Sequence, residues 1–173
     1  MDLVYRRLTE REEQGRPVRV GLVGAGRFGT TVAATLGKMP GARLLAVADI
    51  DPVRGLAALR CAGYHEDDVI RGLAHAQPFD GRKPLLTDEA VALSRLPLDV
   101  IVEATGNPNV AASVIPAALR AGQHVVNVTV EADVLLGASF RRIADAAGVV
   151  YSLADGDQPA CIVRLVDWAR SLG

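Results

Sequence analysis

The sequence predicts an α/β fold, a doubly wound parallel sheet, from two observations. Short apolar segments rich in Val, Leu and Ile alternate with longer segments in which apolar residues recur every three or four positions. The short segments are typical of strands buried on both faces of a sheet, and the longer ones of helices. Because the two kinds alternate, we expect parallel strands joined by right-handed helical crossovers, with helices on both faces.

The first third of the chain predicts a helical arm and two strand–helix units. Good helix formers occupy residues 2–14, and a glycine and a proline follow them as stop signals. The β-branched stretch at 18–26 predicts a buried strand, and the stretch at 27–39 predicts a helix. That helix carries three apolar residues spaced four apart on one face: Phe28, Val32 and Leu36. A second, largely apolar strand is expected at 42–49, and a helix at 52–62.

The middle of the chain predicts shorter elements. We expect a helix over 66–76, a short strand near Leu85–Leu86 and a helix from Asp88. The stretch DVIVEATG, residues 99–106, predicts a fourth strand, because β-branched residues fill it and a glycine ends it. A helix over 110–122 follows, with a proline inside it.

The last part of the chain predicts two further strands. The stretch HVVNVTV, residues 124–130, is β-branched and predicts the fifth strand. A helix over 139–148 separates it from the sixth strand, at 149–154. The final residues, 159–173, predict a terminal helix that begins with a proline.

The composition indicates one globular domain and excludes several classes of protein. The chain has 173 residues, of which 50% are apolar and 23% are charged, and its net charge is -1. The balanced charge argues against a nucleic-acid partner, and no segment resembles a signal peptide or a membrane span. We therefore expect a cytoplasmic protein with no metal, since the cysteines and histidines lack the spacing of metal ligands. These residues are Cys61, Cys161, His65, His75 and His124.

The segment GAGRFG has the spacing G-x-G-x-x-G between a predicted strand and a predicted helix, which is the context of a dinucleotide-binding loop. Gly24 permits the tight turn, Gly26 lets the backbone approach a pyrophosphate, and Gly29 lets the helix pack against the strand. The free N–H groups of the helix N-terminus would attract the phosphates. The alternative is a tight turn that binds nothing. We favour dinucleotide binding, and with it a Rossmann-type NAD(P)-binding fold.

Asp49 ends the second predicted strand, where a carboxylate would accept hydrogen bonds from the adenosine ribose hydroxyls. An ionised Asp49 would repel the 2′-phosphate of NADP, which favours NAD. Arg27 and Arg54 are close enough in sequence to offset that repulsion, so NAD and NADP both stay open, with NAD preferred. The alternative role of Asp49 is to cap the next helix.

The stretch EATGNP closes the fourth predicted strand, near the nicotinamide end of the expected cleft. Thr105 and Asn107 could bind the phosphates or ribose, while Gly106 suits the turn. An ordinary Asn–Gly turn is an equally weighted alternative. The candidate cofactor-binding residues are Gly24, Gly26, Arg27, Phe28, Gly29, Asp49, Thr105, Gly106 and Asn107.

The stretches VRVGLVGAGRFG, DVIVEATG and AGQHVVN together resemble the cofactor domain of homoserine dehydrogenase. The stretches VNVTVEADVLLG and GVVYSLADGDQPACIVRLVDWAR are more specific. They resemble homoserine-dehydrogenase-like oxidoreductases with a C-terminal SAF domain, a group that includes a deoxyxylulose-phosphate-reductoisomerase-like branch. The resemblance implies an NAD(P)-dependent oxidoreductase that transfers hydride between nicotinamide and a small alcohol or carbonyl substrate.

Two departures limit what the resemblance implies. The lysine that homoserine dehydrogenases carry after the HVV motif is missing, and Lys38 and Lys83 lie at no strand end of the cleft. Homoserine and the sugars of the glucose–fructose class are therefore not the expected substrates. The family's members also continue into a substrate and dimerisation domain with a catalytic lysine. We therefore expect a helical arm at 1–16, an NAD(P)-binding domain at 17–158, and a helix at 159–173 leading to an absent domain.

The turn DGDQP, by the same resemblance, lies beside the nicotinamide and the substrate. Asp155, Asp157 and Gln158 would line the substrate side, with Glu131 and Asp133 one strand over. Carboxylates there could hold a substrate hydroxyl or move a proton, so the candidate catalytic residues are Glu131, Asp133 and Asp157. The alternative is that the aspartates form the turn and cap the terminal helix.

Three functions stay open at this point. The first is the cofactor half of an oxidoreductase, which forms a homo-oligomer or associates with a missing C-terminal domain. The second is a stand-alone dinucleotide-binding module that senses cofactor without catalysis, favoured by the lack of a lysine or histidine at the nicotinamide end. The third is an unstable fragment, favoured by the apolar residues of the terminal helix: Ile162, Leu165, Val166 and Trp168.

Overall fold

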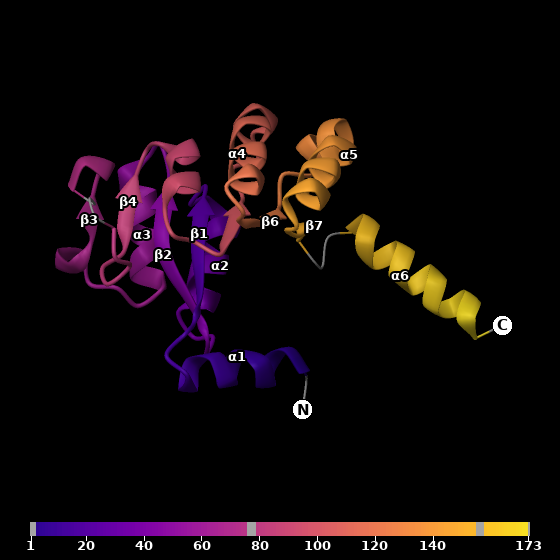
Figure 1. Ribbon diagram of the computed structural model, residues 1–173, viewed down its shortest axis with the longest axis horizontal. Helices are drawn as coiled ribbons and strands as arrows, with labels where there is room; N and C mark the ends of the chain where they lie inside the picture. The colour runs from indigo at the N-terminus through magenta and orange to yellow at the C-terminus, as the bar shows by residue number, and fades with distance from the viewer. Residues whose placement is uncertain (1–2, 76–78, 155–157, 173) are drawn as a thin grey trace.

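The computed structural model describes residues 3–75, 79–154 and 158–172. Within these residues, seven strands form one parallel sheet in the order β3-β4-β2-β1-β5-β6-β7 (Figure 1). The strands are Val18–Val23 (β1), Ala42–Ala48 (β2), Ile70–Arg71 (β3), Leu85–Thr87 (β4), Val100–Glu103 (β5), His124–Asn127 (β6) and Tyr151–Leu153 (β7). The doubly wound parallel sheet of a Rossmann-type fold is therefore confirmed.

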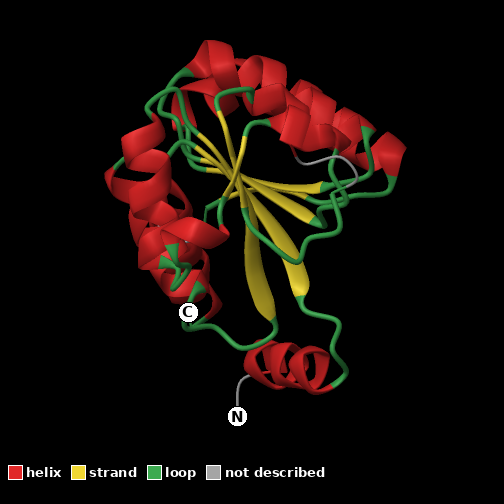
Figure 2. Cartoon of the chain, turned by 90° about the vertical axis from the view of Figure 1, so that its left-hand side faces the viewer, coloured by secondary structure: helices red, strands yellow, loops and turns green. Residues whose placement is uncertain are grey.

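Helices cover both faces of the sheet (Figure 2). The α-helices are Leu3–Glu13 (α1), Arg27–Leu36 (α2), Pro52–Cys61 (α3), Pro108–Arg120 (α4), Val130–Ala147 (α5) and Gln158–Ser171 (α6). The short 3-10 helices are Glu66–Asp68 (η1), Leu73–His75 (η2) and Ala90–Arg95 (η3). α2 and α3 pack on one face of the sheet, and α4, α5 and η3 pack on the other.

The middle of the sheet is buried on both sides. In β2, every residue except Arg43 is buried. Side chains on one face pack beneath α4 and α5, in a core that includes Ile101 and Phe140. Side chains on the other face pack beneath α2 and α3, in a core that includes Leu22 and Leu59. A strand covered on both faces needs apolar residues throughout, which explains the composition of β2.

The strand order reverses between β1 and β5. From β1 the chain moves outward to β2, and it later returns to β5 on the other side of β1. At such a reversal, the loops at the carboxyl ends of the two strands diverge and leave a crevice, where open α/β sheets bind ligands. The GAGRFG loop, Asp49 and the loop after Glu103 all follow carboxyl ends of strands, so they lie at this edge.

Two helices expected in the middle of the chain are wrong. The described part of 66–76 forms η1, β3 and η2, because Gly72 has φ +81° and its N–H bonds to the carbonyl of Leu86 in β4. The residues after Asp88 form only the 3-10 helix η3, which ends two residues before Pro97, and a proline there disfavours the continuation of a helix.

The boundary between β6 and α5 also differs from the expectation. β6 ends at Asn127, whose side-chain oxygen accepts a hydrogen bond from the N–H of Thr129 at 2.9 Å and turns the backbone out of the strand. α5 then begins at Val130 rather than at 139. Glu131 and Asp133 therefore stand in the first turn of a helix and not on a strand, although that turn follows the carboxyl end of β6.

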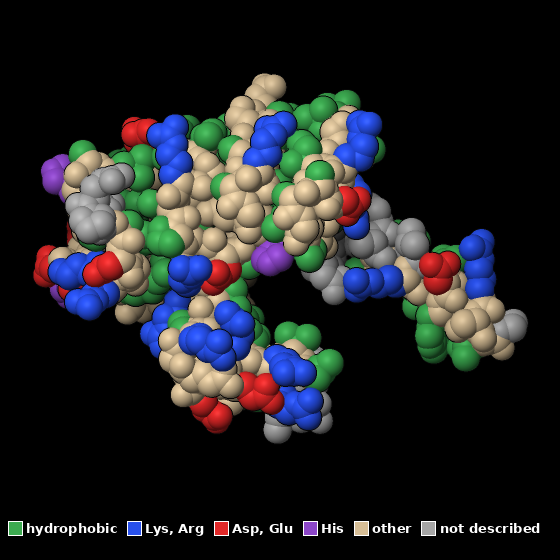
Figure 3. Space-filling view, in the orientation of Figure 1, with side chains coloured by type: hydrophobic (Ala, Val, Ile, Leu, Met, Phe, Trp, Pro, Cys, Tyr) green, Lys and Arg blue, Asp and Glu red, His purple; other side chains and the backbone are tan. Residues whose placement is uncertain are grey.

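The two terminal helices stand outside the layered body (Figure 1). α1 buries no residue, but the carbonyl oxygen of its Leu8 lies 1.9 Å from where a Cβ of Gly41 would be, so only glycine fits there. The carboxylate of Glu12 also accepts a hydrogen bond from the N–H of Gly41, at 3.0 Å. α6 exposes apolar side chains (Figure 3): Ile162, Leu165, Val166, Trp168. Among the described helices, none has the length and apolarity to cross a membrane.

The Asp99 carboxylate joins the amino ends of β1 and β5 and should make the fold sensitive to acid. It accepts hydrogen bonds from the Arg19 guanidinium at 2.6 and 3.1 Å and from the Arg19 backbone N–H at 2.7 Å. These bonds and the Arg19 charge hold the pKa of Asp99 below its ordinary value. A carboxylate with a lowered folded pKa stabilises the fold fully above its unfolded pKa of about 4 and loses that stabilisation as the pH falls through the folded value.

We therefore expect Asp99→Asn to lower the free energy of unfolding by about 1 kcal/mol at pH 7, a modest value because solvent screens this half-exposed pair. The loss should shrink as the pH falls below about 4, because the wild-type carboxylate is then protonated as well. Urea unfolding across this pH range measures the difference. A loss of equal size at every pH would contradict the assignment.

Candidate functional site

The loop between β1 and α2 is packed so tightly that two of its glycines have no room for a side chain. Gly24 has φ +92°, and a Cβ there would lie 2.7 Å from the backbone carbonyl of Ala104. A Cβ on Gly29 would lie 1.9 Å from the carbonyl oxygen of Gly24. Gly26 differs, because it caps the start of α2 in an extended conformation and a Cβ there would meet nothing within 4 Å. The backbone at Gly26 is therefore open to an approaching ligand.

Asp49 connects the end of β2 to this loop. One carboxylate oxygen accepts a hydrogen bond from the N–H of Ala25 at 2.6 Å, and the other accepts one from the N–H of Asp51 at 2.8 Å. Because both donors are backbone groups, the carboxylate is fixed in place beside the glycine loop. Each oxygen keeps a second lone pair, so the carboxylate can still accept hydrogen bonds from the hydroxyl groups of a ligand.

The helix after Asp49 is capped by Asp51. Its Oδ1 accepts hydrogen bonds from the N–H groups of Val53 at 2.9 Å and Arg54 at 3.4 Å, and its Oδ2 lies 3.3 Å from the Arg54 Nε. The capping role considered for Asp49 therefore falls to Asp51. Arg27, at the start of α2, is exposed and makes no ion pair with a described residue.

The loop between β5 and α4 is held by its own side chains. The Glu103 Oε1 accepts hydrogen bonds from the Thr105 N–H at 3.1 Å and from the Thr105 hydroxyl, which in turn accepts one from the Asn107 N–H. The Asn107 side chain caps α4. Gly106 has φ +66°, and its N–H donates to the Thr129 hydroxyl at 3.0 Å. The side chains of Thr105 and Asn107 are thus engaged within the loop, as the turn interpretation expects.

Buried polar side chains stand at the carboxyl ends of β4, β5 and β6, and sequence reasoning missed most of them. They are Thr87, Glu103, Asn127 and Thr129. Glu103 has no exposed surface, and its Oε2 has no hydrogen-bond partner among the described residues. Burying a polar group costs free energy unless it is hydrogen-bonded. A polar residue at the end of each of three apolar strands was the signal in the sequence, because the carboxyl ends of parallel strands lie along one edge of the sheet.

Asp133 belongs to a second hydrogen-bond network, between α5 and β7. The Tyr151 hydroxyl donates to the Asp133 Oδ1 at 2.7 Å and accepts from the Asn127 side-chain amide at 3.1 Å. Burial, together with the hydrogen bond to Asp133, raises the pKa of Tyr151 well above its ordinary value. The phenol therefore stays protonated and keeps Asp133 fixed near the carboxyl ends of β6 and β7.

The remaining candidate residues are exposed or lie outside the described residues. Glu131 is exposed in the first turn of α5. Asp155 and Asp157 lie outside the described residues. Phe28 is 50% exposed in the first turn of α2, whereas Val32 and Leu36, further along the same helix, are partly buried against the core. The first turn of α2 stands at the rim of the sheet, where a side chain projects past the strand ends.

The structure thus brings the glycine loop, Asp49 and the β5–α4 loop together at one edge. The bond from Ala25 to Asp49 joins the first two, and the contact between Gly24 and Ala104 joins the first and the third. The Gly106 bond to Thr129 then extends the cluster toward β6. The described residues contain no group of three or more His, Cys, Asp or Glu side chains that could hold a metal ion.

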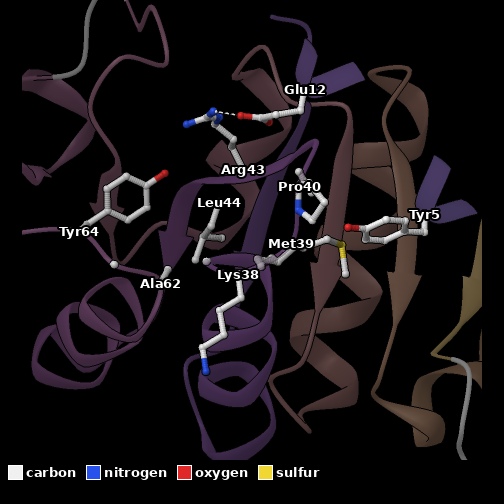
Figure 4. A pocket seen from close by; sticks show the side chains of 13 residues that line it. Tyr5, Glu12, Lys38, Met39, Pro40, Arg43, Leu44, Ala62 and Tyr64 are labelled. Carbon is white, nitrogen blue, oxygen red and sulfur yellow. Dashed lines mark hydrogen bonds and ion pairs between the residues drawn. The ribbon is translucent and has the colours of Figure 1, made fainter. Parts of the chain in front are cut away.

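A separate hollow of about 590 Å³ lies at the opposite edge of the sheet (Figure 4). α1, the C-terminal ends of α2 and α3, and the start of β2 surround it. Tyr5 and Tyr64 stand on opposite sides of it, and the ion pair of Glu12 with Arg43 lies along its rim. It contains none of the candidate site residues, because those lie at the carboxyl ends of the strands.

The sequence matches one family along most of its length. Residues 24–152 match the family described as the NAD-binding domain of homoserine dehydrogenase. The match begins at the first glycine of the GAGRFG loop and ends in β7. No curated protein matches the chain.

Solved structures share the fold at low sequence identity. WlbA dehydrogenase from Bordetella pertussis, solved with NADH and UDP-GlcNAcA, is 22% identical with a TM-score of 0.62, over 91% of this chain and 43% of its own. Biliverdin reductase from Synechocystis sp. PCC 6803, solved with biliverdin and NADP+, is 22% identical with a TM-score of 0.55, over 79% and 37%. Homoserine dehydrogenase from Thiobacillus denitrificans is 21% identical with a TM-score of 0.50, over 79% and 29%. This chain thus spans less than half the length of each.

Gly29→Ala should destabilise the fold strongly. The new methyl group would lie 1.9 Å from the carbonyl oxygen of Gly24, so α2 would have to move away from β1. We expect the free energy of unfolding to fall by about 2–3 kcal/mol or more, measured by urea unfolding. Unchanged stability would contradict the packing described for this loop.

Tyr151 should ionise only at a pH above the ordinary tyrosine range. Subtracting the ultraviolet titration of Tyr151→Phe from that of the wild type isolates its phenolate. Because the folded pKa is raised, the contact stabilises the fold below about pH 10 and is lost as the pH rises through the folded pKa. Asp133→Asn should lower this pKa, since the Asp133 charge is one of its causes. An identical titration in wild type and Asp133→Asn would contradict the network.

Proposed function

Since this chain belongs to the family of homoserine dehydrogenase NAD-binding domains, we propose that it is the cofactor half of an NAD(P)-dependent oxidoreductase. The proposed reaction is hydride transfer between nicotinamide and a small alcohol or carbonyl compound. The observation that carries this proposal is the hydrogen bond from the Ala25 N–H to the Asp49 carboxylate. It joins into one surface the two elements that recognise the pyrophosphate and the adenosine ribose of a dinucleotide.

In this proposal the glycine loop and α2 bind the pyrophosphate. The open space at Gly26 admits the phosphates to the backbone, and the unbonded N–H groups of the first turn of α2 attract their charge. Gly24 and Gly29 act by keeping the loop, the strand and the helix close together. Asp49 accepts hydrogen bonds from the ribose hydroxyls with the lone pairs that Ala25 and Asp51 leave free.

The proposed cofactor is NAD rather than NADP. Two backbone N–H groups hold the Asp49 carboxylate, so it cannot turn away from a 2′-phosphate, and like charges in contact repel. Arg54, one of the two cations that could offset this repulsion, is paired with Asp51. Arg27 is the other.

The proposed substrate end lies where β5, β6 and β7 finish. Asp133 is fixed there by Tyr151, and its Oδ2 has no hydrogen-bond partner among the described residues. We assign it, with Glu131 and Asp157, to holding a substrate hydroxyl and accepting its proton when an alcohol is oxidised. The nicotinamide, when bound, supplies the hydride chemistry, and the protein orients the reacting groups. Thr105 and Gly106 shape the loop at this end.

We also propose that α6 leads to further protein that completes the substrate site. An isolated helix of this length is marginal in water, and its apolar side chains are exposed, so it needs a cover. A C-terminal domain or a second copy of the chain would supply that cover. A stand-alone sensor without catalysis is not favoured, because the matched family is one of dehydrogenase domains.

The first test is a titration of the purified chain with NADH, followed by nicotinamide fluorescence, and we expect saturable binding. Gly26→Ala should leave the free energy of unfolding within about 0.5 kcal/mol of wild type, because its methyl group meets no protein atom. It should weaken NADH binding by about tenfold or more, because the methyl group occupies the space of the pyrophosphate.

Thr31→Ala is the matched control, since Thr31 is exposed on the same helix and its hydroxyl bonds only to the backbone of that helix. It should bind NADH as wild type does. A folded Gly26→Ala chain with wild-type affinity would contradict the proposed site. A folded wild-type chain that binds no NADH would contradict the proposed function.

A further inference from the structure

We infer that Asp51 is a second determinant of cofactor preference, which acts with Asp49 against the 2′-phosphate of NADP. The inference rests on the cofactor site proposed above. It comes from one corner of the structure, the turn between β2 and α3, where three charged side chains lie within six residues: Asp49, Asp51 and Arg54.

The first turn of α3 lies directly beside the Asp49 side chain. A Cβ added to Gly55 would be 3.7 Å from the Cβ of Asp49, and the Asp51 N–H donates to the Asp49 Oδ1 at 2.8 Å. Asp51 and Arg54 therefore begin at the same corner as the carboxylate that would meet the ribose. A phosphate on the ribose 2′-oxygen would enter the field of all three charges.

Asp51 acts on this field in two ways. It adds a second negative charge beside Asp49, and its Oδ2 pairs with the Arg54 Nε at 3.3 Å, which offsets the charge of a neighbouring cation. This pair is exposed, so it is weak and reversible. Arg54 would therefore turn to a phosphate once the Asp51 charge is removed, and guanidinium groups bind phosphate well.

Asp49 is the less suitable position for a change of preference. Its carboxylate holds the N–H groups of Ala25 and Asp51, so its removal loosens the glycine loop and the start of α3 together. Asp51 has a local structural role only, the cap of α3. Serine or asparagine at 51 keeps that cap and removes the charge.

The test is the ratio of NADPH to NADH affinity in Asp51→Ser and Asp51→Asn, measured by nicotinamide fluorescence at low ionic strength. We expect NADPH to bind about tenfold more tightly than to wild type, with NADH affinity changed by less than about threefold. Thermal unfolding checks that both variants are folded, and the serine and asparagine variants serve as replicates of the same charge removal.

Two double variants identify which arginine, Arg54 or Arg27, contacts the 2′-phosphate. Asp51→Ser with Arg54→Ala should lose the part of the gain in NADPH affinity that Arg54 supplies and keep the part that comes from removing the Asp51 charge, whereas Asp51→Ser with Arg27→Ala should retain most of the gain. An unchanged ratio in both folded single variants would overturn the inference, as would a gain that Arg54→Ala does not reduce at all or that depends on Arg27 instead. If wild type binds NADH and the ratio does not move, only this inference fails. If wild type binds neither nucleotide, the proposed function fails first.

Discussion

Backbone hydrogen bonds hold the carboxyl end of β1 to both neighbouring strands, and every feature of the candidate site is built around that point. The Gly24 N–H bonds to the carbonyl of Ala48 at 2.8 Å, and the Ala104 N–H bonds to the carbonyl of Val23 at 2.7 Å. The chain must leave β1 between two strands that are already in contact with it. Glycine at 24 is therefore a steric requirement of the sheet, before any ligand is considered. The loop that results leaves the start of α2 open at the edge where the strand order reverses.

At this edge of the sheet, the Asp49 carboxylate both holds the turn together and is the group proposed to recognise the ribose. Its carboxylate accepts hydrogen bonds from two backbone N–H groups of the turn, and each oxygen keeps a second lone pair. Glu103 has a similar structural role at the end of β5, where its carboxylate orders Thr105 and the loop before α4. Side chains that organise a loop are fixed before a ligand arrives, which reduces the entropy lost on binding.

The parts of the fold that depend on local pattern could be predicted from the sequence, and those that depend on distant partners could not. The strand–helix alternation, β1, β2 and the glycine loop follow from periodicity and from one motif. The segment around Gly72 looked helical, but its backbone instead pairs with β4, which no local pattern records. The start of α5 was missed because the Asn127 side chain, rather than a propensity, ends β6. The bond from Tyr151 to Asp133 joins residues 18 positions apart, and only the tertiary structure brings them together.

The two edges of the sheet have a consequence for how copies of this chain can meet. Both edge strands are short: β3 has two residues and β7 has three. A strand this short offers few unpaired N–H and C=O groups to another sheet, so it is a poor template for strand pairing between molecules. Encounters between copies at high concentration are therefore directed to the exposed side chains of the helices, and growth into extended β-structure is disfavoured by the geometry of the sheet itself.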